Sequence, residues 1–543
     1  MTNSGMLLAA TLALPLAMLA ACLSGRLRDR MPVLLAFAPL PALAAALNEF
    51  RGTTLVLPRA LLGLTFVLDR SGAMLLGASA LLWIAAGAYA AVYLRSERDS
   101  GRFAVWWLMT LTGSLGIFIA ADLMSFYLFF TLVSLAAYGL VVFDSTADAK
   151  YAGAVYISLA VLGEALLLMG FVLLAAASPK GSLLMSDAVT ALATSPWRNA
   201  VLAFLLLGFG LKIGLVPMHV WMPVAYSAAP IPAAAVLSGA AVKAGIVFIR
   251  FLPFERAGPH WGMVLAAAGF FSAFYGVAIG ITQSNPKTVL AYSSVSQMGL
   301  LAAVIGVGLA AGDTKVATPA IFYAVHHTLV KGGLFLAIGV GALTRARSLW
   351  LVLLPAAVLA LGLGGLPLTG GALAKLAIKG SLGDGVAATL ATLSSIASTV
   401  LMFHFLQRLK SNAPTDPRAS ATMGLMSPWL VVAFAAVALP WALYPRIVGG
   451  SFHDALAAKQ LWAALWPVLI GGLLSIVLRQ YRQWLPQVPA GDMLVYAERA
   501  TPAVRDVGAA MEGFDGYLRE WPVAGVLFLA VTIALVGAMF AGR

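Results

Sequence analysis

Three ionisable side chains stand in the middle of long apolar segments of this chain. Glu164 lies in VLGEAL, Lys243 in AVKAG and Lys331 in HHTLVK. Placing each such charge at the centre of a membrane-spanning helix costs about 2.5–3.5 kcal/mol, so we expect each to be kept for a function. Burial disfavours the charged form of both kinds of group, which brings their proton affinities closer together. The three residues are therefore candidates for a proton relay, although Glu164 is also consistent with a carboxylate that pairs with a structural partner.

Two adjacent histidines precede Lys331 on the same segment. His327 is four residues before the lysine and shares its helix face, whereas His326 points elsewhere. A histidine can pass a proton to a lysine whose charged form is disfavoured by burial. The alternative for either histidine is a hydrogen bond to a neighbouring helix. The remaining histidines lack the spacing of a metal site, so we expect no metal in this chain; they are His219, His260, His404 and His453.

Two apolar segments are interrupted by proline and glycine. The first break follows Lys212 in KIGLVP, where Pro217 lacks a backbone N–H, and the second is the run GGLPLTGG at 364–371. Freed backbone carbonyls are tolerated in hydrocarbon only where protein or trapped water satisfies them, so matched breaks predict an ion path near the membrane midplane. Two ordinary proline kinks are the alternative. At the second break Lys375 is favoured as the relay residue over Lys379, which can extend to the polar boundary.

The composition identifies the class of protein that holds these residues. Of 543 residues, 61% are hydrophobic and 10% are charged, which leaves too few polar side chains to cover soluble domains. We therefore expect an all-α polytopic membrane protein. Its net charge of +13 then reflects the placement of Lys and Arg in loops on one side of the membrane. The sequence contains no basic domain that would bind nucleic acid. The one cysteine, Cys22, permits no internal disulfide and no Cys-ligated cluster. There is no glycine-rich dinucleotide turn, so we expect no cofactor in this chain and redox chemistry only in partner chains.

Apolar runs long enough to cross a bilayer predict about 14–16 transmembrane helices. They lie near 5–23, 31–48, 71–94, 104–121, 123–142, 152–176, 199–216, 230–252, 261–282, 287–310, 317–343, 348–379, 385–408, 427–445, 459–478 and 522–541. We divide the chain into N-terminal helices (1–103), two five-helix blocks (104–252 and 261–408) and C-terminal helices (409–543) with a connector at 480–521. The broken helix is the fourth of each block. Because each block has an odd number of helices, the second would cross the membrane in the opposite sense, which predicts an inverted repeat.

The loops and the two ends of the chain indicate its placement in the membrane. If the N-terminus is outside, the loops on the inside carry more Lys and Arg than those on the outside. The box Leu19–Cys22 is typical of a lipoprotein cleavage site, but no Lys or Arg precedes its apolar run, so a first transmembrane helix is preferred.

In the connector an apolar stripe predicts an interfacial helix that lies against a neighbouring subunit or on lipid headgroups; its residues are Val504, Val507, Met511, Phe514 and Leu518.

Four stretches carry a family resemblance. They are Lys212–Pro232 (KIGLVPMHVWMPVAYSAAPIP), Lys287–Gly299 (KTVLAYSSVSQMG), His326–Gly339 (HHTLVKGGLFLAIG) and Pro367–Lys375 (PLTGGALAK). With Leu68-Asp69 they span most of residues 60–410. In order and content they resemble the antiporter-like membrane subunits shared by respiratory complex I, Mrp-type cation/proton antiporters and energy-converting membrane hydrogenases, including formate hydrogenlyase. The resemblance implies two inverted half-channels joined by a polar axis, with the family's proton-relay positions held by Lys212, Lys243, His327, Lys331 and Lys375.

The sequence departs from this family at one position. Where the family's fifth helix carries a glutamate, this chain has Thr131 in FFTLVSL. The missing acid would pair with Lys212 and control the protonation of this lysine by Coulomb attraction. We expect Glu164, one helix later, to supply the carboxylate instead. The accessory residues would be Thr131, Asp69, His326 and Lys379.

The sequence therefore predicts a proton-translocating subunit of a multisubunit energy-converting complex in a bacterial-type inner membrane. The proton relay would consist of Glu164, Lys212, Lys243, His327, Lys331 and Lys375. The chain itself would hold no catalytic centre, so any NADH, formate or hydrogen chemistry would belong to partner chains. Two alternatives stay open: a subunit of an Mrp-type sodium/proton antiporter, and a structural scaffold whose channel is vestigial. The expected partners are other membrane subunits, the lipid bilayer and protons, with sodium in the antiporter case and no nucleic acid.

Overall fold

A computed structural model describes residues 3–48, 53–58, 63–178, 181–414, 416, 418–481, 483 and 486–495. The chain divides into two units, Met1–Val488 and Pro489–Arg543. In the second unit the described residues are 489–495. The helix predicted at 522–541 and the apolar stripe of the connector lie outside the described residues; the stripe comprises Val504, Val507, Met511, Phe514 and Leu518.

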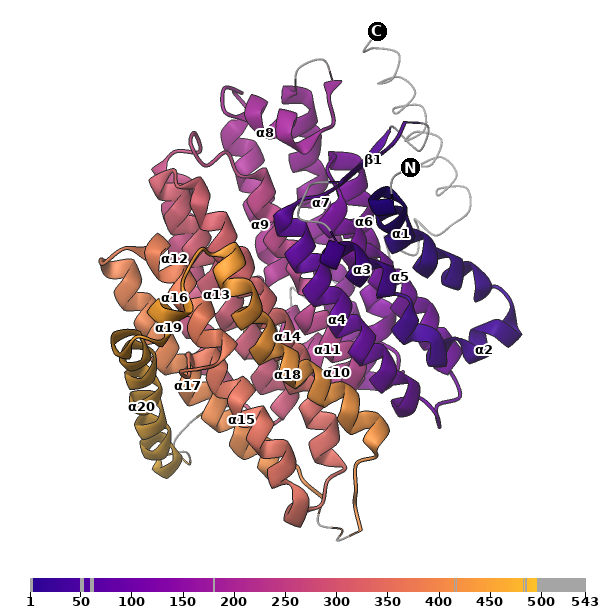
Figure 1. Cartoon of the computed structure of the whole chain (residues 1–543), viewed down its shortest axis with the longest axis vertical. Coiled ribbons are helices and arrows are strands. Elements are labelled where there is room, and N and C mark those ends of the chain that lie inside the picture. Colours follow the sequence, from indigo (N-terminus) through magenta and orange to yellow (C-terminus); the bar gives the residue numbers. More distant parts are fainter. Residues whose placement is uncertain are drawn as a thin grey trace. The chain divides into compact units, whose positions relative to one another are not determined.

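Helices make up most of the first unit (Figure 1). The α-helices are α1 (Asn3–Ala21), α2 (Gly25–Leu34), α3 (Leu40–Asn48), α4 (Arg70–Tyr93), α5 (Ser100–Ile119), α6 (Leu123–Val141), α7 (Ala147–Ala177), α8 (Met185–Leu192), α9 (Arg198–Ile213), α10 (Trp221–Ala228), α11 (Ile231–Gly239), α12 (Pro259–Gly280), α13 (Pro286–Ala311), α14 (Ala317–Ala342), α15 (Trp350–Gly364), α16 (Gly370–Leu382), α17 (Val386–Ser411), α18 (Met423–Ile447), α19 (Phe452–Leu456) and α20 (Ala458–Gln480). The 3₁₀ helices are η1 (Leu35–Phe37), η3 (Ala241–Phe251), η4 (Thr314–Val316) and η5 (Ala346–Ser348), and the strands are β1 (Thr53–Leu57) and β2 (Leu64–Leu68).

Thirteen helical segments of the described part are long and apolar enough to span a membrane. Two further segments, α9 with α10 and α15 with α16, are each divided at a break that the sequence predicted. Their pieces are too short to cross the hydrocarbon individually, but each pair together covers enough residues. The prediction of an all-α polytopic membrane protein is confirmed.

Two local features differ from the sequence-based expectation. β1 and β2 form a small antiparallel hairpin in which Thr53 lies opposite Leu68 and Leu57 opposite Leu64. Both strands are rich in β-branched and other apolar residues, but five residues are too few to stand out beside long apolar helices. The single helix predicted at 31–48 is divided into α2 and α3, because Pro39 restricts the backbone between them.

The two predicted blocks contain comparable series of elements. The first runs through α5, α6, α7, the broken pair α9–α10, and α11 with η3. The second runs through α12, α13, α14, the broken pair α15–α16, and α17. In both series the fourth member is the interrupted one. The domain boundaries and the inverted relation between the blocks stay predictions.

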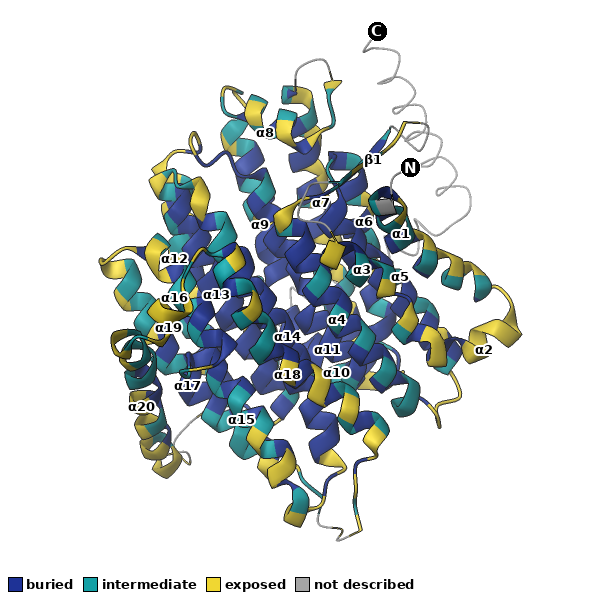
Figure 2. Ribbon diagram, in the orientation of Figure 1, coloured by how far each residue is buried: buried dark blue, intermediate teal, exposed yellow. Residues whose placement is uncertain are grey.

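Helix α14 lies at the centre of the first unit. Every residue from Ala320 to Gly341 is buried, and the helix contacts α4, α11, α13, α15, α16 and α18 (Figures 1 and 2). In Figure 2 much of the ribbon around α11 and α14 is coloured as buried, whereas most of α20 is coloured as exposed or intermediate. Polar residues on α14 are therefore surrounded by protein and not by lipid.

Glycines allow α12 and α13 to pack closely. Gly262, Gly269 and Gly276 recur every seven residues on α12 and face the α13 backbone. A Cβ atom on Gly276 would lie 2.6 Å from the carbonyl oxygen of Tyr292 and 2.8 Å from the backbone nitrogen of Ser296. Close contact between small residues is a main source of helix association in membranes. This contact fixes α13, which carries several of the polar residues described below.

We expect Gly276→Ala to destabilise the protein, because the added methyl group meets α13 backbone that cannot move independently. Overpacking of this kind costs about 1–3 kcal/mol. Thermal unfolding of the purified protein in detergent should show a lower Tm. Gly380→Ala is the matched control, because a Cβ there meets no atom within 4 Å. Equal Tm values for the two variants would contradict the proposed packing.

Candidate functional site

The first break is stabilised by side chains. α9 ends at Ile213 and is capped by Gly214, which has a left-handed backbone (φ 73°). The carbonyl of Leu211 accepts from the backbone N–H of Gly214 at 3.2 Å and from the indole nitrogen of Trp221 at 2.9 Å. The backbone N–H of Val216 donates to the hydroxyl of Ser272 at 3.0 Å. Backbone groups within the break thus find partners inside the protein, as an interruption at membrane depth requires.

Lys212 and Glu164 are connected through two hydroxyls on α6. The ammonium of Lys212 donates to Ser134 Oγ at 2.8 Å and lies 5.3 Å from the ring centre of Phe130. The hydroxyl of Thr131 donates to Glu164 Oε2 at 2.6 Å. Thr131 and Ser134 are one helical turn apart, and Glu164 and Lys212 lie within electrostatic range of each other. Glu164 therefore lies where it could replace the missing acid, and its role as that replacement stays a prediction.

A small cavity extends from Lys212 toward the next helix. It is lined by Lys212, Tyr156 and Tyr226 and has a volume of about 10 Å³, close to what one water molecule needs. Tyr156 donates to the carbonyl of Ser134 at 2.8 Å, and Tyr226 donates to the carbonyl of Leu237 at 3.3 Å. Apart from Lys212 and these two tyrosines, most of the cavity lining is apolar.

Lys243 lies just after the change from α11 to the 3₁₀ helix η3, and not within a regular α-helix as the apolar run suggested. Its ammonium donates to the carbonyl of Gly239 at 2.7 Å and to that of Ser238 at 3.4 Å. The lysine is fully buried. Long 3₁₀ stretches are uncommon, and within a helix they often mark a functional hinge or strain. Here the tightening supplies the lysine with carbonyl partners at the end of α11.

Two serine hydroxyls lie between the main-chain carbonyls that accept from Lys243 and the one that accepts from Lys331. The hydroxyls of Ser238 on α11 and Ser294 on α13 are 3.0 Å apart. Ser294 also donates to the carbonyl of Leu290 at 3.1 Å, and the ammonium of Lys331 donates to the same carbonyl at 2.9 Å. All of these groups are buried. The two central lysines are thus connected by hydrogen-bonding groups of α11, α13 and α14.

Polar side chains continue from Lys331 along α14. Tyr323, His327 and Lys331 are spaced by four residues and share one face of the helix. The imidazole of His327 is buried, and neither of its nitrogens has a hydrogen-bond partner in the described ranges of the chain. Tyr323 donates to Gln297 Oε1, and Gln297 Nε2 donates to Ser398 Oγ at 2.9 Å. The polar groups thereby reach α17.

The second break places Lys375 beside α17. α15 ends in Gly365, whose backbone is left-handed (φ 101°). The ammonium of Lys375 donates to the freed carbonyl of Gly364 at 2.8 Å and to Ser395 Oγ at 2.6 Å. Ser395 and Ser398 are one turn apart on α17, so Lys375 stands at the end of the same series of groups.

A cavity of about 250 Å³ lies beside the second break. Its lining includes Lys375, Lys379, Thr392, Ser395 and Gln460, together with apolar residues of α16 and α20. Lys379 is exposed, and no hydrogen bond or ion pair of its side chain exists within the described part of the molecule. Lys375, which is half-buried and hydrogen-bonded, is thus one helical turn from the exposed Lys379.

His326 faces the second break and not the lysines of the centre. A Cβ on Gly370 would lie 2.9 Å from its Nδ1, and one on Gly371 would lie 3.0 Å from its Nε2. Both glycines belong to the first turn of α16. The prediction that His326 and His327 point in different directions agrees with this geometry.

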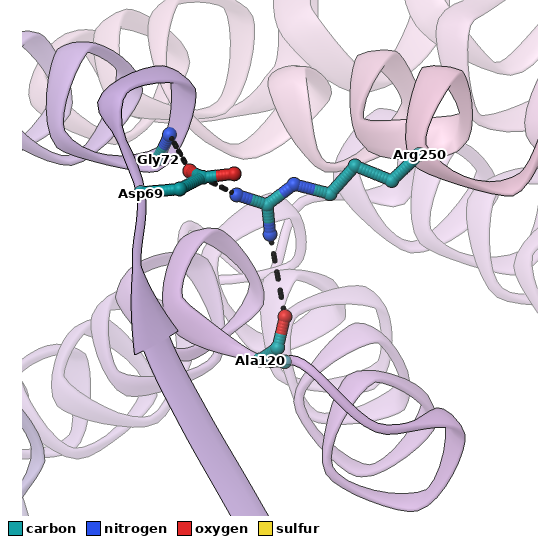
Figure 3. A network of polar contacts seen from close by, with 4 residues as sticks. All are labelled: Asp69, Gly72, Ala120 and Arg250. Carbon is teal, nitrogen blue, oxygen red and sulfur yellow. Dashed lines mark hydrogen bonds and ion pairs between the residues drawn. The ribbon is translucent and has the colours of Figure 1, made fainter. Parts of the chain in front are cut away.

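Asp69 forms a network of polar contacts with Gly72 and Arg250 (Figure 3). Its Oδ1 accepts hydrogen bonds from the backbone N–H of Gly72 and from the guanidinium of Arg250, both at 2.6 Å. Arg250 also donates to the carbonyl of Ala120 at 3.3 Å. The carboxylate therefore caps α4 and anchors the end of η3, and its side chain is half exposed.

Several uncharged residues of this site were missed by sequence reasoning. They are Ser134, Ser238, Ser294, Gln297, Tyr323, Ser395 and Ser398. The available signal was clustering: SSVSQ at 293–297 and SSIAST at 394–399 place polar residues inside apolar helices. Among the residues that the structure describes, no three of His, Cys, Asp and Glu lie close enough to hold a metal ion.

Known proteins resemble this chain over its central part. Residues 120–402 match the family described as NADH:quinone oxidoreductase/Mrp antiporter, TM. NADH-quinone oxidoreductase subunit N of Desulforudis audaxviator is 33% identical over 288 residues, covering 51% of this chain and 56% of that protein. Hydrogenase-4 component B of Escherichia coli is 29% identical over 290 residues (51% and 43%), and a Na(+)/H(+) antiporter subunit of Bacillus subtilis is 32% identical over 264 residues (46% and 33%). The matched regions thus span between a third and just over half of these relatives.

Two solved structures share the fold. The Mrp complex from Dietzia sp. DQ12-45-1b contains a chain with a TM-score of 0.77 and 21% identity, covering 99% of this chain and 63% of that one. The membrane-bound sulfane sulfur reductase, an archaeal respiratory membrane complex, gives a TM-score of 0.69 and 18% identity, covering 87% and 99%. At these identities the likeness establishes the fold. Because the family match itself covers just over half of the sequence, this chain belongs to the NADH:quinone oxidoreductase/Mrp antiporter family of transmembrane proteins.

Proposed function

We propose that this chain is a proton-translocating subunit of a multisubunit energy-converting membrane complex. The observation that supports this function most is the buried series of polar groups, which extends from Glu164 through Lys212, Lys243 and Lys331 to Lys375. The helices around it keep its charges away from lipid, where they would be costly. Its relatives, which include a subunit of an NADH-quinone oxidoreductase, support the same class of function.

The neutral groups between the lysines suit proton transfer. A hydroxyl both donates and accepts hydrogen bonds, so Ser134, Ser238 and Ser294 can each receive a proton on one side and release one on the other. The unpartnered nitrogens of His327 are of the kind that ordered water satisfies in protein interiors. Water there would connect Lys331 to the groups on α17.

Repulsion between like charges would couple the steps. Lys243 and Lys331 lie within electrostatic range of each other, and His327 lies within range of both. A proton on one of these groups disfavours a proton on the next. A charge that arrives at one end of the series would therefore displace protons along it, and the cavity beside Lys375 would serve as an outlet.

The complex, its location and its orientation belong to the same proposal. Other membrane subunits would supply the reaction that drives transport. This chain would then provide the path for protons and would need no redox site of its own. The bacterial relatives favour an inner membrane, and the distribution of Lys and Arg favours an N-terminus on the outside.

A role in cation/proton antiport is the second candidate. It is supported by the similarity to a subunit of the Bacillus subtilis Na(+)/H(+) antiporter and to a chain of an Mrp complex. The purified complex in vesicles would distinguish the two, because an antiporter should change internal pH when a sodium gradient is imposed without any electron donor. A pH response that requires an electron donor and ignores sodium would exclude antiport.

We expect Glu164→Gln to reduce proton uptake by vesicles that contain the purified complex. Losing an acid–base group from a transfer path costs about 10²-fold or more in rate. The amide keeps the size of the side chain, so assembly with partner subunits should be unchanged. Glu255→Gln, in an exposed loop, is the matched control. Full uptake by Glu164→Gln would show that the first half of the path works without this carboxylate.

We expect Lys375→Gln to block proton release, whereas Lys379→Gln should leave it near normal. The first lysine is hydrogen-bonded within the break, and the second is exposed one turn away. The rate of internal pH change, read with a trapped dye, should fall by about tenfold or more only for the first variant. Equal, near-normal rates for both variants would favour the structural scaffold over the transporter.

A further inference from the structure

A cavity of about 590 Å³ lies at one end of the central helices. Its walls come from α4, α11, α13, α14 and the end of α17. Tyr89, Ile231, Lys287, Ile338 and Gly339 are among the residues that line it. None of them belongs to the relay described above. The cavity nevertheless contacts α11, α13 and α14, the three helices that carry its centre.

Lys287 lines this cavity on α13, the helix that also supplies a partner of Lys331. Its ammonium donates to the carbonyl of Ala229 at 2.8 Å, near the start of the helix. One helical turn further along α13, the carbonyl of Leu290 accepts the hydrogen bond from Lys331. On α14 the cavity residue Ile338 lies seven residues from Lys331, a rise of about 10 Å. About two helical turns of α14 therefore separate the cavity from the central lysine.

The cavity lining includes a buried tyrosine, Tyr89. Tyr89 is fully buried, lines the cavity, and its hydroxyl has no hydrogen-bond partner in the ranges that the structure describes. The hydroxyl faces α14 at Gly339, where any side chain would collide with it. Buried tyrosine hydroxyls usually find a partner, and ordered water fills this role where the site is polar and large enough.

The charges near the mouth of the cavity suit exchange with water. Asp144, in the loop between α6 and α7, lies within electrostatic range of Lys287. Burial raises the pKa of the Asp144 carboxyl from its ordinary value, while Lys287 opposes this shift and Glu97 adds to it. Ser284, Asn285 and Asn412 add further polar groups to the lining. A carboxyl that holds protons more readily than usual, beside an open cavity with several polar groups in its lining, can collect protons from the aqueous phase.

We propose that this cavity is a water-filled inlet that supplies protons directly to Lys331, with Lys287 and Tyr89 as its lining polar groups. This inlet reaches the centre of the relay without passing through Glu164 and Lys212. The proposal rests on the proposed proton transport, but the hydration of the cavity can be measured without it. The inlet opens on the face that carries Arg95, Arg345 and Arg408, which the positive-inside rule assigns to the cytoplasm.

Thiol labelling tests the inlet, because Cys22 is the one cysteine of the sequence. In a Cys22→Ser background, Ile338→Cys and Ile231→Cys place thiols on the cavity wall. Val264→Cys, exposed on α12 within the apolar belt, is the lipid-facing control, and Leu334→Cys is a fully buried control on α14. The probe is a membrane-impermeant anionic methanethiosulfonate, applied to one face of vesicles that hold the purified complex.

We expect both cavity thiols to react from the basic face at least about tenfold faster than either control, because thiolates form and meet the reagent only in water. Modified Ile338→Cys should also lose most of its proton uptake. Cavity thiols as slow as Val264→Cys would overturn the proposal, as would complete modification that leaves uptake unchanged. If the unmodified complex shows no uptake, the proposed function fails, and the labelling rates still decide whether the cavity holds water.

Discussion

The structure depends on one constraint: a charged side chain inside an apolar membrane protein needs polar partners that lie inside the protein as well. Lys212, Lys243, Lys331 and Lys375 all satisfy it, with hydrogen bonds to hydroxyls or main-chain carbonyls. Ordinary helices offer few free carbonyls, because each already accepts a bond from the following turn. The tightening after α11 and the break after α15 supply carbonyls to Lys243 and Lys375, and Ser134 and Ser395 supply hydroxyls. Lys331 instead donates to the carbonyl of Leu290 within the regular helix α13. Irregular backbone therefore accompanies three of the four lysines.

The chemical type of the partners bears on function. A carboxylate directly on each lysine would favour its charged form and hold the proton in place. Here the direct partners are neutral oxygens, which satisfy the ammonium and still permit it to lose a proton. Glu164 differs from these neutral partners. Its carboxylate accepts a hydrogen bond from Thr131 and influences Lys212 from a short distance. Thr131 stands where the family usually has an acid. A carboxylate and a lysine still share one polar cluster, because Glu164 lies one helix later.

Much of the site could be predicted from the sequence, because a charge in an apolar run is conspicuous. The lysines within the apolar segments, the two breaks and the different directions of His326 and His327 were of this kind. The β-hairpin, the 3₁₀ conformation after Lys243 and the hydroxyl links could not be predicted in the same way. A serine is common in membrane helices, and only the three-dimensional crossing of α11 with α13 brings Ser238 to Ser294. Asp69 stood in a family motif, but its partner Arg250 is far away in sequence, so its anchoring role required the fold.

The central claim is that internal water and neutral hydroxyls join the buried lysines into one path. It is tested most directly by an experimental density map of the assembled complex at a resolution that shows ordered water. Water should appear in the cavity between Lys212 and Tyr226, and between His327 and the polar groups of α17. A map in which these places are dry and filled by apolar side chains, with the lysines bonded to separate and unconnected groups, would contradict the claim.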